Sequence, residues 1–268
     1  MKKSAQVLMI GTLVLYASCT VGQEETAEAP VPRPAGPSSA DPSALAAADS
    51  CVLAMGGWEG WNQARYLTFD FVIEREGEEL RRTTHQWDRF GGNCRVQGSN
   101  REGVHYDVVM NITSQEGTVL LEGEPADEES HASFLELAHG VFINDMYWLL
   151  MPFKLHDPGV HLTDEGARTD EDGNTWRVIH LRFDTGVGLT SEDQYWVYLD
   201  PETYRVHRWD FHLEGMEKEK PANVASWEGW QQYGPIWLST EKRPPNSNIV
   251  LRFENVEVSS EVPEGVFG

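Results

Sequence analysis

The chain has 268 residues and a formal net charge of -22 at pH 7, because 43 Asp and Glu stand against 21 Lys and Arg. Nucleic acids and anionic lipid headgroups attract basic proteins, so this charge excludes electrostatic docking onto either of them. Hydrophobic residues make up 40% of the chain and include ten Trp, which is enough apolar material for a folded core.

The N-terminus has the three-part layout of a bacterial secretory signal. A positive start at residues 1–3 is followed by an apolar run from Ala5 to Tyr16 and by small residues just before Cys19. We therefore expect residues 1–18 to be a signal peptide and Cys19 to be lipidated. The protein would then be exported and anchored in the bacterial cell envelope, at the periplasmic face or in the outer membrane. The alternative is an ordinary secretory signal, with Cys19 incidental.

Residues 19–42 are rich in Pro, Ala, Glu and Ser and contain almost no large apolar residue. This composition is typical of an extended, disordered spacer, here a tether behind a lipid anchor. No second linker of this kind follows. The simplest organisation is a single folded domain over residues 43–268.

The folded part is expected to begin with a helix and to continue with strands. Alanine-rich residues 43–55 favour a helix that stops at Gly56 and Gly57. Apolar and polar residues then alternate from Leu67 to Ile73, which indicates a strand. Similar patterns, separated by turns, predict an antiparallel meander that continues over residues 80–88, 94–97, 104–112, 118–122, 176–184, 194–199, 204–213, 226–232, 235–242 and 249–258.

One segment breaks the strand pattern. Residues 131–151 contain no Pro and are apolar on more than one face, which predicts a long helix. Ser130 can cap its start, and Pro152 is expected to end it. Such a helix cannot remain in solvent, so we expect it to bury against the sheet.

Several stretches of the chain resemble an uncharacterised family of bacterial exported proteins, described as a domain of unknown function. They are Gly56-Gly57-Trp58 with Trp61-Asn62, the block from Asn144 to Leu155 with Asp157-Pro158, and the block from Tyr195 to Tyr204. More distantly, the layout is similar to the Lol-type lipoprotein carrier and receptor fold of Gram-negative envelopes. The resemblance implies a mainly β fold with α: a curved antiparallel half-barrel of about ten strands, with a long apolar helix covering its concave face. It also implies an apolar ligand and no known catalytic residues.

Loose packing of the helix would turn the concave face into a pocket for a long apolar molecule, whereas tight packing would make it a core. The candidate cavity residues are large apolar side chains on the expected strands and helix. They are Leu67, Phe69, Phe71, Trp87, Phe142, Trp148, Phe183 and Trp209. Side chains of this kind are more often core residues than ligand contacts.

Two cysteines remain when Cys19 is assigned to the anchor. In an oxidising compartment, Cys51 and Cys94 can form a disulfide. The alternative is two buried thiols, because the sequence does not place their Cα atoms within bonding range.

Metal and nucleophile motifs are weak. The nine His form no His-Glu-x-x-His, and His156, Asp157 and His161 are a loop trio of metal-capable side chains whose proximity is more often accidental. Ser239 and Lys242 match the Ser-x-x-Lys string of penicillin-recognising enzymes, but strand alternation predicts that they point to opposite faces. The sequence indicates no cofactor and no metal.

The favoured hypothesis is a non-catalytic envelope lipoprotein that binds a lipid or other apolar ligand. Its expected partners are that ligand, the membrane through the anchor, and a further envelope protein; nucleic acid is excluded. One alternative is a structural or protein-interaction module with a dry core. Another is a hydrolase or metal enzyme that uses loop residues 153–193.

Overall fold

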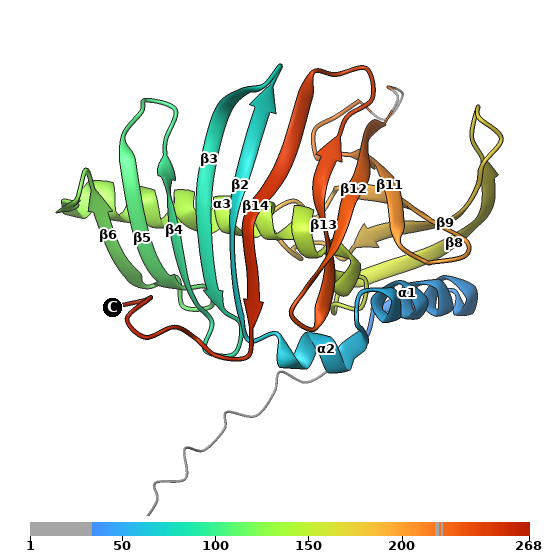
Figure 1. Ribbon diagram of the computed structural model, residues 1–268, viewed down its shortest axis with the longest axis horizontal. Helices are drawn as coiled ribbons and strands as arrows, with labels where there is room; N and C mark the ends of the chain where they lie inside the picture. Colours follow the sequence, from blue (N-terminus) through green and yellow to red (C-terminus); the bar gives the residue numbers. More distant parts are fainter. Residues whose placement is uncertain (1–33, 218–219, 221) are drawn as a thin grey trace, which may run out of the picture.

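The computed structural model describes residues 34–217, 220 and 222–268. The expected signal peptide, the expected lipidation site Cys19 and most of the expected tether lie outside these residues. Within them the chain is mainly β, with three helices and one open sheet of fourteen strands (Figure 1). The spatial order of the strands is β1-β8-β9-β10-β11-β12-β13-β14-β2-β3-β4-β5-β6-β7.

The helices are α1 (Pro42–Ala54), α2 (Gly57–Gln63) and α3 (Glu128–Lys154). The strands of the first half are β1 (Ser39–Ala40), β2 (Tyr66–Arg75), β3 (Glu78–Asp88), β4 (Asn93–Ser99), β5 (His105–Asn111), β6 (Gly117–Leu121) and β7 (Glu124–Pro125). Those of the second half are β8 (Val160–Thr169), β9 (Thr175–Phe183), β10 (Gln194–Leu199), β11 (Val206–His212), β12 (Asn223–Tyr233), β13 (Ile236–Arg243) and β14 (Ile249–Ser259).

Helix α3 runs across the sheet and contacts both of its halves (Figure 1). Near its start the ring of Phe134 lies 5.9 Å from that of Tyr106 on β5. Near its end the ring of Trp148 lies 4.6 Å from that of Trp209 on β11. The expectation of a long apolar helix that buries against the sheet is therefore confirmed.

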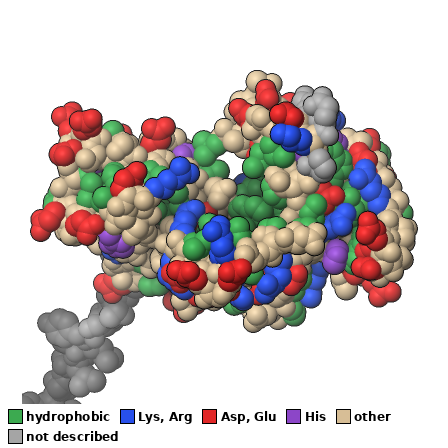
Figure 2. Space-filling view, turned by 90° about the horizontal axis from the view of Figure 1, so that it is seen from above, with side chains coloured by type: hydrophobic (Ala, Val, Ile, Leu, Met, Phe, Trp, Pro, Cys, Tyr) green, Lys and Arg blue, Asp and Glu red, His purple; other side chains and the backbone are tan. Residues whose placement is uncertain are grey.

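The core divides into two clusters along α3. The first joins α3 to the middle strands through residues such as Phe69, Phe71 and Phe142. The second joins α1 and the end of α3 to strands β8–β12. Trp148 packs against both clusters. From above, the surface is hollowed between two parts of the molecule, and hydrophobic side chains gather in the hollow (Figure 2).

The ends of α3 differ from the expectation. The capping residue is Asp127, whose side chain accepts a hydrogen bond from the Ser130 backbone N–H. Pro152 does not end the helix but lies in its last turn, before Lys154. A proline lacks only one backbone donor, and the buried neighbours Met151 and Phe153 hold this turn in the core.

The structure has fourteen strands where about ten were expected. β8 was missed because the polar residues of 153–173 resemble a loop, and β1 and β7 are only two residues long. β1 pairs with β8 in parallel, so the sheet is mixed rather than wholly antiparallel. Ser39 and Ala40 of this strand fall in the segment expected to be tether, so the ordered chain includes its end.

A second helix, α2, follows α1 directly and was also missed. The glycine pair does stop α1, but Gly56 then serves as a corner, with φ of +106°. A Cβ at Gly56 would lie 2.4 Å from the Pro235 carbonyl oxygen, so only glycine allows this close approach to β13. The Trp237 N–H donates to the Met55 carbonyl beside it, at 2.9 Å.

Candidate functional site

A pocket of about 680 Å³ opens beside the second half of α3. Its walls are α3, strands β8–β11 and the loop between β9 and β10. The volume falls within the range of about 300–1,000 Å³ that is usual for small-molecule sites. The lining residues are Ile143, Asn144, Tyr147, Trp148, Lys154, Asp157, Pro158, Val160, Phe183, Val187, Gly188, Leu189, Thr190, Asp193, Tyr195, Trp209, Phe211, Leu213 and Glu214.

Aromatic side chains from the helix and the strands face one another across this pocket. Tyr195 pairs with Phe211 in the β10–β11 register, and alternation places Trp209 on the same face as Phe211. The Tyr147 ring lies 5.4 Å from the Tyr195 ring, and the Trp148 ring lies 5.7 Å from the Phe211 ring. The lining is thus mainly apolar, which suits a hydrocarbon ligand.

Three of the predicted cavity residues, Trp148, Phe183 and Trp209, line this pocket. The others belong to the first core cluster instead: Leu67, Phe69, Phe71 and Phe142 are buried there, and Trp87 packs against it half-buried. Phe142, for example, contacts the Trp87 ring at 5.6 Å. The hydrophobic period of a strand or a helix indicates which of its faces is apolar. It does not indicate whether side chains of another element fill the space over that face.

The polar side of the pocket is organised by Asp193, which the sequence analysis missed. Its carboxylate is buried and accepts hydrogen bonds from the Tyr195 hydroxyl at 3.0 Å and the Thr190 hydroxyl at 2.8 Å. The Glu214 N–H donates to its other oxygen at 2.6 Å. These bonds fix the loop between β9 and β10 against β11. Thr190 and Tyr195 are close to Asp193 in the sequence, but the pairing with Glu214 depends on the fold and could not be read from a local motif.

The loop trio of His156, Asp157 and His161 does not converge, in line with the interpretation that its spacing in the sequence is accidental. His156 is buried with its ring 5.3 Å from that of Trp58, and Asp157 pairs with Lys154 at 2.5 Å. Across the described ranges of the chain, no three His, Cys, Asp or Glu side chains are grouped to hold a metal ion.

His161 instead connects β1 to the sheet. Its Nδ1 lies 2.6 Å from the Ser39 hydroxyl, and its Nε2 lies 2.7 Å from Asp184 Oδ1. A Ser-His-Asp hydrolase uses Nε2 toward the serine and Nδ1 toward the aspartate, which is the reverse order. Ser38 donates to the other oxygen of Asp184 at 2.9 Å. We interpret these hydrogen bonds, which join Ser38, Ser39, His161 and Asp184, as a clamp that holds β1 against β8 and the end of β9.

Ser239 and Lys242 were expected on opposite faces, and this expectation is wrong. Lys242 Nζ donates to the Ser239 hydroxyl at 2.7 Å and to the Ser239 carbonyl at 2.9 Å. Alternation describes where the Cβ atoms point, whereas a long lysine side chain can curl back along its own strand. Both residues are wholly buried, so no substrate can reach them.

Cys51 and Cys94 are two free, buried thiols and not a disulfide. Cys51 packs in the second core cluster and Cys94 in the first, so each is held by different neighbours. Burial raises the pKa of both thiols to about 12, which keeps them protonated and unreactive.

A buried charged cluster joins the middle of α3 to β3. Asp145 is wholly buried and accepts from Arg81 at 3.0 Å, and the His85 ring nitrogen lies 2.9 Å from the same oxygen. Asn144 donates to the other oxygen at 2.8 Å. Asn144 also lines the pocket, so the cluster lies at the edge of the pocket.

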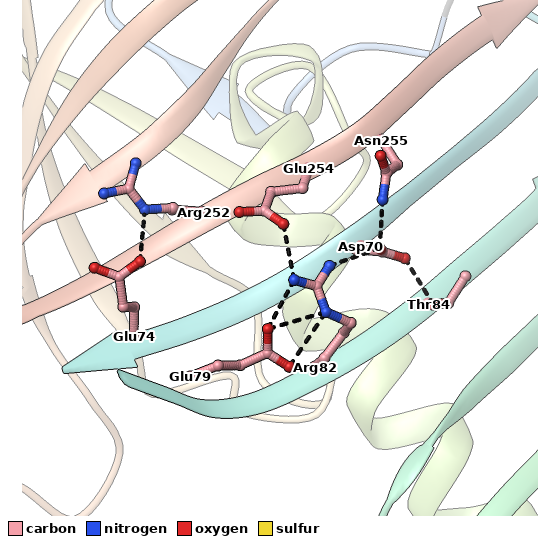
Figure 3. A network of polar contacts seen from close by, with 8 residues as sticks. All are labelled: Asp70, Glu74, Glu79, Arg82, Thr84, Arg252, Glu254 and Asn255. Atoms are coloured by element: carbon pink, nitrogen blue, oxygen red, sulfur yellow. Dashed lines mark hydrogen bonds and ion pairs between the residues drawn. The ribbon is translucent and has the colours of Figure 1, made fainter. Parts of the chain in front are cut away.

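The strands beside this region carry a polar network that links β14, β2 and β3 (Figure 3). Arg82 contacts Asp70 at 2.7 Å, Glu79 at 2.7 Å and Glu254 at 2.8 Å. Burial alone would raise the pKa of Asp70, but hydrogen bonds from Thr84, Asn255 and Arg82 outweigh it, so its pKa is lowered.

The lowered pKa of Asp70 predicts a loss of stability in acid. The contribution is complete above the unfolded value near 3.8 and disappears as the pH falls through the lower folded value. We expect the melting temperature of the Asp70→Asn variant to vary less between pH 5 and pH 3 than that of the wild type. Calorimetry at a series of pH values measures both slopes, and equal slopes would contradict the assignment.

Residues 126–226 match the model of a family of unknown function (DUF6503). This confirms the expected resemblance to an uncharacterised family over that part of the chain, which includes α3 and strands β8–β11. No protein with curated annotation matches the chain.

Several solved structures are similar to this chain over most of its length. A DUF1329 family protein from Desulfovibrio piger is 13% identical, with a TM-score of 0.49 over 84% of this chain and 97% of that one. A LolA superfamily protein from Nitrosomonas europaea is 9% identical, with a TM-score of 0.47 over 84% and 97%. A putative outer membrane lipoprotein-sorting protein domain from Vibrio parahaemolyticus is 10% identical, with a TM-score of 0.44 over 84% and 96%.

Proposed function

We propose that this protein is a lipid-anchored protein of the bacterial cell envelope that binds an acyl chain in the pocket between α3 and strands β8–β11. In this proposal the sheet acts as a half-barrel, α3 covers its inner face, and a single domain over 43–268 follows the anchor at Cys19. The observation that supports it is the pocket of about 680 Å³ with its largely apolar lining.

The packing of α3 distinguishes this proposal from a dry interaction module. Phe142 is buried against the rings of His85 and Trp87 on β3. Farther along the helix, Tyr147 and Trp148 border open volume instead. An apolar cavity exposed to water is costly unless something fills it, so the incomplete packing favours a ligand over a core.

The enzyme alternative rests on residues 153–193, which include strands β8 and β9. In the part of the chain that the structure describes, none of their His side chains joins a metal-binding group, and His161 clamps β1.

No helix among the described residues has both the length and the apolarity to cross a membrane.

A charge at the pocket wall should prevent binding without unfolding the protein. Leu213 lines the pocket and is 43% exposed, so in the unliganded Leu213→Glu variant the new carboxylate can stay in water and the protein should fold. A bound probe would remove water from that carboxylate, so we expect at least about a tenfold loss of affinity for the neutral fluorescent probe N-phenyl-1-naphthylamine.

The matched control is Leu80→Glu. Leu80 is 47% exposed and does not line the pocket, so the same change should leave probe affinity as in the wild type. Native mass spectrometry of the wild type should also reveal co-purified lipid. Equal affinities for the two variants, or no binding of the probe to the wild type, would contradict the proposed site.

A further inference from the structure

Two residues that line the pocket each carry a buried hydrogen-bond donor without a partner among the described residues. The donors are the hydroxyl of Tyr147 and the indole N–H of Trp209. The two rings are nearly parallel, with their centroids 6.0 Å apart. An unsatisfied buried donor costs free energy comparable to a lost hydrogen bond, so such atoms in a pocket often indicate where a ligand atom belongs.

The neighbouring Tyr195 hydroxyl provides the contrast. It lies in the same pocket but donates to Asp193 at 3.0 Å. That carboxylate already accepts from Thr190 and from the Glu214 N–H. Asp193 thus accepts three hydrogen bonds, none of them from Tyr147, which leaves the Tyr147 hydroxyl available to a ligand.

The charges around the pocket select a neutral acceptor over an anion. Asp157, Asp193 and Glu214 line it, and its single cation, Lys154, is paired with Asp157. Burial first, and then the nearby carboxylates of Asp157 and Asp193, raise the pKa of Tyr147 well above its usual value, so its hydroxyl remains a donor. A carboxylate or phosphate placed here would face like charges in a poorly solvated site.

We propose that the pocket binds a neutral acyl ester or amide, whose carbonyl oxygen accepts a hydrogen bond from the Tyr147 hydroxyl, with the Trp209 indole as a second donor. This rests on the proposed function and names the chemical class of its ligand. The hydrocarbon would lie against Phe183 and Phe211, and the carbonyl would face α3.

The test compares three ligands of similar length in displacing N-phenyl-1-naphthylamine from the full mature chain. They are methyl dodecanoate, which has a neutral carbonyl, dodecanoate, which is an anion, and tetradecane, which has no acceptor. We expect the wild type to bind methyl dodecanoate more tightly than dodecanoate. Tyr147→Phe should weaken methyl dodecanoate about threefold to tenfold, the usual effect of one hydrogen bond, and leave tetradecane unchanged.

Tyr195→Phe is the matched control, because it removes a hydroxyl that is already bonded within the protein. It should change the affinities for methyl dodecanoate and tetradecane by the same factor. Without ligand, the Tyr147→Phe variant should melt at or above the wild-type temperature, since its hydroxyl has no partner to lose.

Three results would overturn the inference. They are tighter binding of dodecanoate than of its methyl ester, an equal effect of Tyr147→Phe on ester and alkane, and a clear loss of stability in the unliganded variant. If tetradecane and methyl dodecanoate bind equally well to the wild type and to Tyr147→Phe, the proposed function stands and only the ester assignment fails. If the wild type binds neither ligand nor the probe, the proposed function itself is wrong.

Discussion

Replacing Asp145 with Ala is expected to reduce the free energy of unfolding by about 2–3 kcal/mol, because the buried His85 ring loses its partner and the partly exposed Arg81 guanidinium loses its counter-charge. The carboxylate is wholly buried and contacts both Arg81 and His85. Its removal would leave the Arg81 guanidinium without its counter-charge and the His85 ring without an acceptor. Because Asp145 lies at the middle of α3, we expect the helix to loosen over the pocket as well.

Urea denaturation followed by far-ultraviolet circular dichroism measures this loss. The control is Asp157→Ala, which removes an ion pair between half-exposed side chains at the end of the same helix. Such pairs contribute under about 1 kcal/mol, so the control should unfold close to the wild type. Asp145→Asn keeps the shape and one acceptor and should fall between the two. A similar cost for Asp145→Ala and Asp157→Ala would show that the buried cluster does not hold the helix.

Replacing Lys242 with Met is expected to stabilise the protein by about 1–3 kcal/mol, as replacement of a poorly compensated buried charge by an apolar side chain often does. Lys242 is wholly buried, and its Nζ lies 3.7 Å from the centre of the Trp227 ring. Its bonded neighbour would not be left unsatisfied, because the Ser239 hydroxyl also bonds to the Glu228 carbonyl at 2.7 Å.

The pH dependence of the unfolding free energy tests whether the buried charge of Lys242 is the cause of the gain. Burial lowers the pKa of Lys242 well below 10.5, so above the folded pKa the unfolded chain binds a proton that the folded chain lacks. Wild-type stability should therefore rise as the pH increases from the folded pKa toward 10.5, and this rise should be absent in Lys242→Met. The melting temperature should increase by about 2–4 °C for each kcal/mol gained. A lower melting temperature would mean that the ammonium contact with Trp227 stabilises the fold.

Local sequence patterns predicted most of the strands because their side chains alternate between core and solvent. The hairpin over 194–213 is an example: β10 and β11 pair there, and Asp200 accepts from the backbone of Glu202 and Thr203 at the turn. β8 was missed because its alternation of buried and exposed side chains is short. Val160 and Leu162 are buried, but the polar residues Asp164 and Glu165 come soon after and make the segment resemble a loop.

The candidate site could be predicted only in part. Trp148, Phe183 and Trp209 were recognised as large apolar side chains on suitable elements, and they do line the pocket. Phe69 and Phe142 satisfied the same criterion and lie in a filled core. The difference depends on which side chains of other elements fill the space beside each residue, and periodicity within one element carries no information about those neighbours.

The position of β1 has a mechanical consequence. The Ser38 N–H donates to the carbonyl of Val160, and Val160 is part of the pocket wall. Tension on the N-terminal segment would thus act on the pocket wall, through the hydrogen bonds that join Ser39, His161 and Asp184. If Cys19 carries lipid, the segment from Cys19 to Ser38 spans at most about 65 Å when fully extended. The cavity would then stay within a comparable distance of the bilayer surface, and the proposed ligand would have only that distance of water to cross.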